Sequence, residues 1–359
     1  MDKSDTPRQE VPASTLPQIQ VTVQGITNQY RAECLGQQMF QILREVGEYI
    51  DISALDGVTV AVDYDEALRD LVRGLDGLAP LSRTNDEGLA GVGKSVVVMR
   101  GDAVKTHIVL SAGPICPIGL EEADRDEEDF RTAIAIIAHE CAHVEENAFR
   151  EDQFPGIHFR PPTGHFIRDH EQHFAEACWG EYAVCRLSAG FALNEEARFR
   201  DNLAVRLKNC RDRARDAIRS YRLHGNVVRV FQEVGIVILE PLRIASYLFG
   251  HLDGMNESDP LCEVAPELPT EDQAFVRVIG RLVERLRRLW DKRGDWPSYD
   301  ALIDVGAVGF QLFEEFGVHA QPQPDGQAYI NVPFTADTMP VGSTQADMVR
   351  AALRGGYRS

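Results

Sequence analysis

The hydrophobic positions in the first third of the chain alternate between helical and strand-like spacing. Apolar residues recur every three or four positions from residue 29 to 50, which predicts an amphipathic helix. The β-branched run at 58–62 predicts a strand, and the apolar positions at 67–72 predict a short second helix. Two more strands are expected at 95–99 and 106–112.

The rest of the chain has mainly helical periodicity. Long helices are expected at 167–189, 194–224, 226–250, 271–293 and 298–316, followed by a short strand at 328–332. Prolines and glycines at 149–168 predict an irregular loop. We therefore expect an α+β fold that is helix-rich, with a small mixed sheet packed on one central helix and a mostly helical C-terminal region. The polar ends, 1–18 and 335–359, are expected to be flexible tails.

Composition narrows the class of protein. The chain has 359 residues and is 44% hydrophobic, which is enough for one large or two ordinary domains with a core. A net charge of -19 opposes non-specific binding to nucleic acid or anionic lipid. The seven cysteines include no CxxC pair, which is typical of reduced thiols in a cytosolic protein. With no leader-like segment and no uninterrupted apolar run of about twenty residues, a cytoplasmic location without membrane contact is expected.

The central helix carries the main chemical signal. Residues 139–143 read His-Glu-Cys-Ala-His. A spacing of four residues places His139 and His143 on one helix face, where both imidazoles can bind one zinc ion. Glu140 would then lie beside the metal and could accept a proton from a water molecule that attacks a carbonyl carbon. The motif therefore predicts metal-assisted hydrolysis, with Glu140 as the general base.

A catalytic zinc ion has three protein ligands, so the two histidines have to be joined by one more. The longer pattern HExxHxxGxxH is absent, because Glu146 and Phe149 stand where it has Gly and His. A di-iron carboxylate site would need a second ExxH, and no other histidine follows a glutamate at that distance. A glutamate from the next helix is the remaining solution, and three are available: Glu171, Glu176 and Glu181.

Glu181 is favoured as the third ligand. Its neighbours at helical spacing are small or apolar, so this helix face should pack on the HExxH helix, and a carboxylate in such surroundings needs a cation. Glu176 has polar neighbours, among them Gln172 and His173, which suit a residue that orients a ligating histidine. Glu176 is the second choice and Glu171 the third.

These residues resemble the gluzincin group of zinc metallopeptidases, in which an HExxH motif is followed by a helical glutamate. The strand pair before the motif and the segment Trp179-Gly-Glu181-Tyr-Ala183 look most like the ImmA/IrrE-type family, intracellular metallopeptidases linked to cleavage or control of repressors. The resemblance covers roughly residues 58–190. It implies a zincin-like metallopeptidase domain at 19–190, a helical domain or extension at 191–334, and a protein or peptide substrate. The long gap from His143 to Glu181 and the lack of an evident helix-turn-helix module depart from that family's pattern.

Two other functions are compatible with the sequence. In the first, the chain is a regulatory or interaction protein whose metal site is structural or vestigial. In the second, it binds a nucleotide, because residues 88–95 (GLAGVGKS) match the phosphate-binding pattern GxxxxGK[ST]. That pattern binds phosphate where a strand enters the loop and a helix leaves it. Here the residues before the loop, 80–87, are polar, and residues 96–99 after it are strand-like. A glycine-rich hairpin or loop is therefore the favoured interpretation.

Several further side chains could assist at a zinc site. Candidates for stabilising an oxyanion are His158, His165, His170, His173, Tyr182 and Arg186, although surface or packing roles are more usual for each. The strand at 106–112 precedes the HExxH helix, and an edge strand in that place would pair with an extended peptide. The basic segment 198–222 is expected to be a helix whose arginines pair within the protein.

Overall fold

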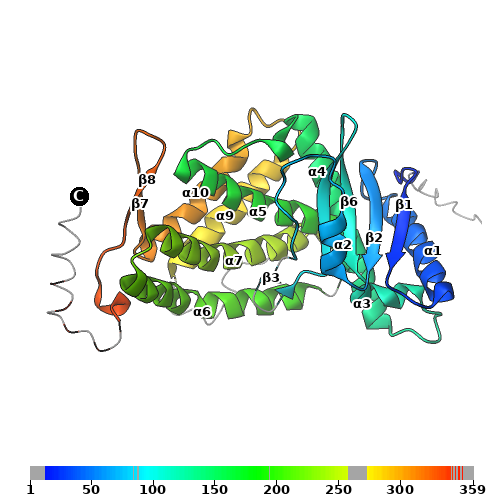
Figure 1. Cartoon of the computed structure of the whole chain (residues 1–359), viewed down its shortest axis with the longest axis horizontal. Helices are drawn as coiled ribbons and strands as arrows, with labels where there is room; N and C mark the ends of the chain where they lie inside the picture. The colour runs from blue at the N-terminus through cyan, green and yellow to red at the C-terminus, as the bar shows by residue number, and fades with distance from the viewer. Residues whose placement is uncertain are drawn as a thin grey trace, which may run out of the picture. The chain divides into compact units, whose positions relative to one another are not determined.

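The computed structural model describes residues 13–83, 85–86, 89–193, 195–257 and 273–340, together with 342, 344, 347 and 350. It is an α+β structure with a small mixed sheet and a mostly helical C-terminal region, as predicted (Figure 1). The chain forms two compact units: Met1–His158 with Leu187–Ala192, and Phe159–Arg186 with Leu193–Ser359. No helix within the described ranges has the length and apolar character needed to cross a bilayer.

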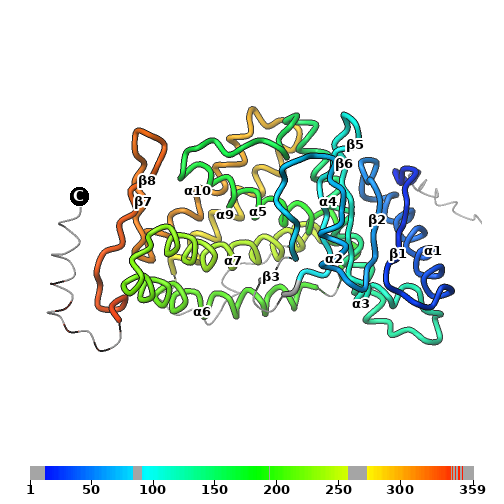
Figure 2. The backbone as a smooth tube through the Cα atoms, viewed as in Figure 1, coloured from blue at the N-terminus to red at the C-terminus, as the bar shows by residue number. Residues whose placement is uncertain are grey.

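The first unit is built on a four-stranded sheet with the order β1–β2–β6–β5 (Figure 2). Strands β1 (Gln20–Gln24), β2 (Leu55–Ala61) and β6 (Ala103–Ser111) are parallel, and β5 (Gly93–Arg100) runs antiparallel to β6. The strands predicted at 58–62, 95–99 and 106–112 are confirmed. The hydrophobic pattern does not predict β1, because its side chains are at most half buried.

The edge of this sheet differs from the prediction. Strand β6 pairs with β2 on one side and with β5 on the other. The prediction that residues 106–112 form an edge strand is therefore wrong, and β5 is the edge strand next to β6. The short strands β3 (Asn85–Asp86) and β4 (Leu89–Ala90) pair with each other rather than with β5. The error arises because the sequence pattern shows which segments are strands but not which segments pair.

Helix α1 (Gln29–Val46) begins at the N-cap Asn28, whose side chain accepts a hydrogen bond from Arg31 N. Its buried residues are Leu35, Met39, Ile42, Leu43 and Val46, which are the apolar positions that predict the helix. Helix α2 (Tyr64–Asp70) ends before Val72, which is 74% exposed. Between β6 and the central helix lie α3 (Ala112–Ile115) and the 3-10 helix η1 (Cys116–Gly119).

The central helix α4 (Glu127–Gln153) begins at Asp126, which accepts hydrogen bonds from Glu128 N and Asp129 N. The acidic first turn favours this start, because negative charge is stabilising near a helix N-terminus. The helix continues to Gln153, so the irregular loop predicted from residue 149 begins later than expected. The first proline and glycine of this segment are Pro155 and Gly156, and before them the helix has side-chain contacts about one turn apart, from Arg150 to Glu146 and to Asn147.

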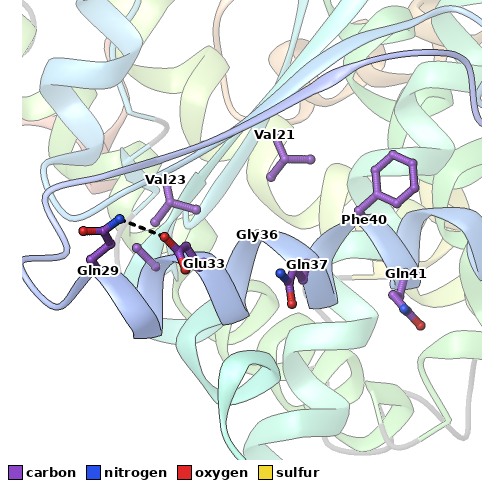
Figure 3. Close-up of a pocket in the computed structure, with 9 residues that line it drawn as sticks. Val21, Val23, Gln29, Glu33, Gly36, Gln37, Phe40 and Gln41 are labelled. Carbon is purple, nitrogen blue, oxygen red and sulfur yellow. Dashed lines mark hydrogen bonds between the residues drawn. The ribbon is translucent and has the colours of Figure 1, made fainter.

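A shallow groove lies between α1 and β1 (Figure 3). Its walls carry Val21 and Val23 from the strand and Phe40 from the helix, and Gln29 donates a hydrogen bond to Glu33 at one end. None of the predicted zinc ligands lines it.

The second unit is helical. Its elements are α5 (Phe166–Ser188, whose last two residues belong to the first unit), α6 (Glu195–His224), α7 (Val227–Gly254), α9 (Gln273–Asp291), α10 (Asp300–Glu315), and the hairpin of β7 (His319–Pro322) with β8 (Ala328–Asn331). Helices α6 and α7 lie side by side (Figure 1). The five predicted helices and β8 are confirmed, and β7 is an additional strand. The predicted domain boundaries at 190 and 334 remain predictions.

Glycines allow other helices of this unit to approach α5 closely. A Cβ atom on Gly250 of α7 would lie 2.3 Å from the main-chain oxygen of Tyr182, and one on Gly306 of α10 would lie 1.7 Å from that of Glu171. Neither position has room for a side chain. The backbone of α5 is therefore fixed against α7 and α10 by direct contact.

Candidate metal centre

The two histidines of the HExxH motif lie one turn apart on α4. Their ring centroids are 5.0 Å apart, the ring planes are inclined by 80°, and both side chains are half buried. Cys141, between them in sequence, is fully buried, and burial raises the pKa of its thiol. The spacing thus gives the shared face that the sequence predicts and directs Cys141 into the core.

Glu181 on α5 completes the group. One ligand atom from each of His139, His143 and Glu181 lies within 4.8 Å of the other two, and no other such group of three occurs in the ranges that the structure describes. The structure therefore brings together the three residues predicted as metal ligands.

The donor set fits zinc. Two imidazole nitrogens and one carboxylate oxygen are the protein ligands of many catalytic zinc sites, which keep a fourth position for water or substrate. Ligand atoms about 2.1 Å from a tetrahedral zinc ion are ~3.4 Å from one another, a spacing that small side-chain rotations can reach from the observed one. All three side chains are half buried, so the group is shielded yet accessible.

Tyr247 of α7 contacts the predicted third ligand. Its hydroxyl forms a hydrogen bond with Glu181, and its pKa is raised well above the ordinary value by burial first and then by the negative charge of Glu181. Around Glu181, Cys178 and Cys185 are buried, in agreement with the apolar face predicted from the sequence. The sequence gives no sign of Tyr247, because its partner is on a different helix.

The other two candidate glutamates are outside the group. Glu176 accepts hydrogen bonds from Gln172, at 2.9 Å, and from the hydroxyl of Tyr299. Glu171 is partly buried, and this burial raises the pKa of its carboxyl. Neither residue is near enough to the histidines to share a metal ion with them.

Glu140, the predicted general base, is 7% exposed. The Ser95 hydroxyl donates a hydrogen bond to Glu140 Oε2 at 2.7 Å. The charge of Glu140 acts on two neighbours: it adds to burial in raising the pKa of Tyr64, and it opposes the burial that lowers the pKa of Lys94. The carboxylate is thus largely shielded from solvent and accepts a hydrogen bond from a serine of the sheet.

The segment that matches the phosphate-binding pattern forms part of the sheet. Gly93, Lys94 and Ser95 begin β5, so a strand follows the glycines where a phosphate-binding loop has a helix N-terminus. Lys94 Nζ donates to the main-chain oxygen of Ser82 at 2.9 Å. Gly88, the first residue of the pattern, lies outside the described residues. This geometry gives no support to nucleotide binding.

The remaining candidates either have structural contacts or are exposed. His158 donates to the Asn147 main-chain oxygen at 2.9 Å, and His170 to that of Phe166 at 2.7 Å. Tyr182 is fully buried; its hydroxyl donates to Asp253 at 2.6 Å and accepts a hydrogen bond from Arg186. His165 and His173 are exposed.

Comparison of the chain with family models, with curated proteins and with solved structures found no match. A function therefore has to be inferred from the residues and geometry of the chain itself.

Proposed function

We propose that this protein is a zinc-dependent hydrolase, most specifically a cytoplasmic metallopeptidase that cleaves a protein or peptide. The observation that carries the proposal is the convergence of His139, His143 and Glu181, with the buried Glu140 on the same helix turn. His139, His143 and Glu181 would hold the zinc ion. When bound there, zinc supplies a Lewis acid that polarises a carbonyl group and lowers the pKa of a water molecule.

Glu140 has the surroundings expected of a general base. Its carboxylate accepts a proton from the attacking water and can deliver this proton to the nitrogen of the leaving amine. Low exposure limits competing contacts with bulk water, and the Ser95 hydrogen bond restricts the orientation of the carboxylate. A general base contributes only if it is held within reach of the proton that it takes.

The number of ligands favours catalysis over a structural role for the metal. Structural zinc sites use four protein ligands and are closed, whereas three protein ligands leave a position for water or substrate. Three are found together among the described residues. A purely structural zinc ion also has no need of a buried carboxylate beside it.

A peptide substrate is supported by the position of β5. This strand lies at the edge of the sheet and contacts Glu140 through Ser95. An edge strand can bind an extended peptide through main-chain hydrogen bonds, which would place a peptide bond near the general base. The resemblance of the HExxH and Trp179–Ala183 segments to gluzincins points to the same substrate class.

The test is Glu140→Gln in the full-length, zinc-loaded chain, assayed with a library of fluorescence-quenched peptides. We expect zinc content near that of the wild type and a loss of kcat of about 100- to 10,000-fold, because a glutamine side chain cannot accept the proton. Glu128→Gln, at the exposed start of α4, is the matched control and should keep full activity. If Glu140→Gln kept both zinc and full activity, the metal site would be structural or vestigial instead.

A further inference from the structure

Two residues of β5 contact the Glu140 side chain. The Ser95 hydroxyl lies 2.7 Å from Glu140 Oε2 and 2.9 Å from the Glu140 main-chain oxygen. A hydroxyl has a single proton, and its hydrogen bond to a charged carboxylate is stronger than one to a neutral carbonyl. The carboxylate is therefore the favoured acceptor, and the hydrogen bond fixes the orientation of its plane.

Gly93 leaves space for the other carboxylate oxygen. A Cβ atom at this position would lie 2.5 Å from Glu140 Oε1 and 2.9 Å from Cδ, closer than atoms can approach without displacement. The Glu140 side chain has little room to retreat, since it is already buried. Any residue larger than glycine at position 93 would therefore move the carboxylate.

The sheet holds both contact residues in a fixed register. Gly93 pairs with Leu110 and Ser95 with Ile108 of β6, and both partner residues are buried. Residues two apart on a strand point to the same face, so Gly93 and Ser95 act on Glu140 together. A group held by a paired strand is positioned more firmly than one held by a loop.

We propose that Gly93 and Ser95 together position the Glu140 carboxylate: Gly93 leaves the space that the carboxylate occupies, and Ser95 is a positioning residue for the general base. The inference rests on the proposed hydrolase function, which it deepens. Ser95 keeps its own proton throughout; its hydrogen bond sets the orientation in which Glu140 accepts one. The Gly-Lys-Ser sequence that resembles the end of a phosphate-binding loop thus has a different role here, at the base of the hydrolytic site.

The kinetic test compares Ser95→Ala with Ser95→Thr in the full-length, zinc-loaded chain. We expect Ser95→Ala to lower kcat by about 10- to 100-fold while KM for the same peptide and zinc affinity stay unchanged, because only the orientation of Glu140 is lost. Ser95→Thr keeps the hydroxyl and should recover most of kcat. Ser53→Ala, at an exposed serine, is the matched control and should keep the wild-type kcat.

The structural test does not depend on activity. In crystal structures of the zinc-loaded chain we expect Ser95→Ala to release the Glu140 carboxylate from its wild-type orientation, and Gly93→Ala to displace it. An unchanged carboxylate in both variants would overturn the inference. So would a loss of activity in Ser95→Ala that is explained entirely by loss of zinc.

The outcomes separate this inference from the proposed function. If Glu140→Gln is inactive while Ser95→Ala has the wild-type kcat, the hydrolase proposal stands and the positioning role of Ser95 is wrong. If Glu140→Gln has the wild-type activity, the hydrolase proposal fails, and with it any role for Ser95 in catalysis, whatever the crystal structures show.

Discussion

At the scale of single residues, the hydrogen bond from Tyr247 to Glu181 gives a prediction about metal affinity. A ligand carboxylate that is oriented by a second side chain loses less freedom when it binds metal. We expect Tyr247→Phe to weaken zinc binding by about 10-fold or more, because the phenyl ring keeps the packing but removes the hydroxyl that contacts Glu181. The measurement is a competition titration of the metal-free protein against a zinc chelator.

Tyr329→Phe is the matched control for this substitution. Tyr329 is 58% exposed on β8, so removing its hydroxyl should leave zinc affinity unchanged. Equal zinc affinities for Tyr247→Phe and the wild type would show that the contact with Glu181 does not prepare it for metal binding.

The sequence predicts the metal ligands better than the residues that support them. His139 and His143 are four positions apart on one helix, so helix geometry alone places them together, and the apolar neighbours of Glu181 mark its face as buried. Ser95 and Glu140 are 45 positions apart and meet only because β5 packs against α4. No local pattern encodes such a contact, and for this reason Ser95 and Tyr247 could not be assigned from the sequence.

At the scale of helices and strands, glycine positions determine how closely α5 is packed. A methyl group at position 250 would collide with the main-chain oxygen of Tyr182, the residue after the predicted ligand Glu181. We expect Gly250→Ala to lower the free energy of unfolding by about 1–3 kcal/mol and to weaken zinc binding as well, because α5 has to shift away from α7. Urea denaturation and a zinc competition titration measure the two effects.

Gly280→Ala serves as the control for a helical glycine. Gly280 is exposed on α9, and a Cβ atom there would meet nothing within 4 Å. Alanine should therefore stabilise the protein by about 0.5–1 kcal/mol through its higher helix propensity. A similar stabilisation in Gly250→Ala would contradict the close approach of α5 and α7.

A partly buried polar network links three strands of the sheet and predicts a pH dependence of stability. Asp56 accepts hydrogen bonds from Arg100 and, at 2.9 Å, from His107 Nδ1, while His107 Nε2 lies 3.0 Å from the Thr59 hydroxyl. Burial lowers the pKa of His107 although Asp56 opposes this change. A neutral ring, which donates from Nδ1 and accepts at Nε2, satisfies both partners.

This network should weaken as the pH falls. His107 in the unfolded chain has an ordinary pKa of about 6.5, so below that pH the unfolded chain takes up a proton that the folded chain resists. The stabilisation is complete above about pH 6.5 and is lost as the pH drops through the lower pKa of the folded state. His107→Asn keeps an N–H group for Asp56 and cannot titrate; its free energy of unfolding should fall less between pH 7.5 and 5 than that of the wild type. Equal pH dependence would contradict this role for His107.

The success of prediction at this scale depends on how strongly an element is buried on one side. Helix α1 and strand β6 have clear patterns because one face of α1, and Thr106 and Ile108–Leu110 of β6, lie in the core. Strands β1 and β7 have only partly buried or exposed side chains, so their sequences carry no such period. The order of strands in the sheet, and with it the identity of the edge strand, depends on pairing that hydrophobic spacing does not record.

At the scale of the whole molecule, charge is distributed so that the basic helix α6 is neutralised within the protein. Arg206 and Arg213 both pair with the buried Glu240, and Arg215 pairs with Asp337. These ion pairs confirm the prediction that the arginines of 198–222 pair internally. Removing Glu240 would leave the charges of these two arginines without their partner, which is costly for a buried ion pair. The negative net charge of the chain therefore does not describe the charge around α6.

The folding stability of the whole chain should depend on zinc if the three ligands act together. An ion that binds only the folded state stabilises it by about 2.7 kcal/mol when its free concentration is 100 times the dissociation constant. For a chain of this size that corresponds to a rise in Tm of roughly a few degrees. We expect zinc to raise Tm in differential scanning calorimetry and a chelator to reverse the rise.

Two histidine variants test whether this effect comes from the predicted site. His143→Ala, which removes one of the three ligands, should strongly reduce the rise in Tm, whereas His165→Ala, at an exposed histidine outside the group, should keep it. An identical zinc effect in wild type and His143→Ala would place the stabilising ion elsewhere and separate the HExxH helix from metal binding.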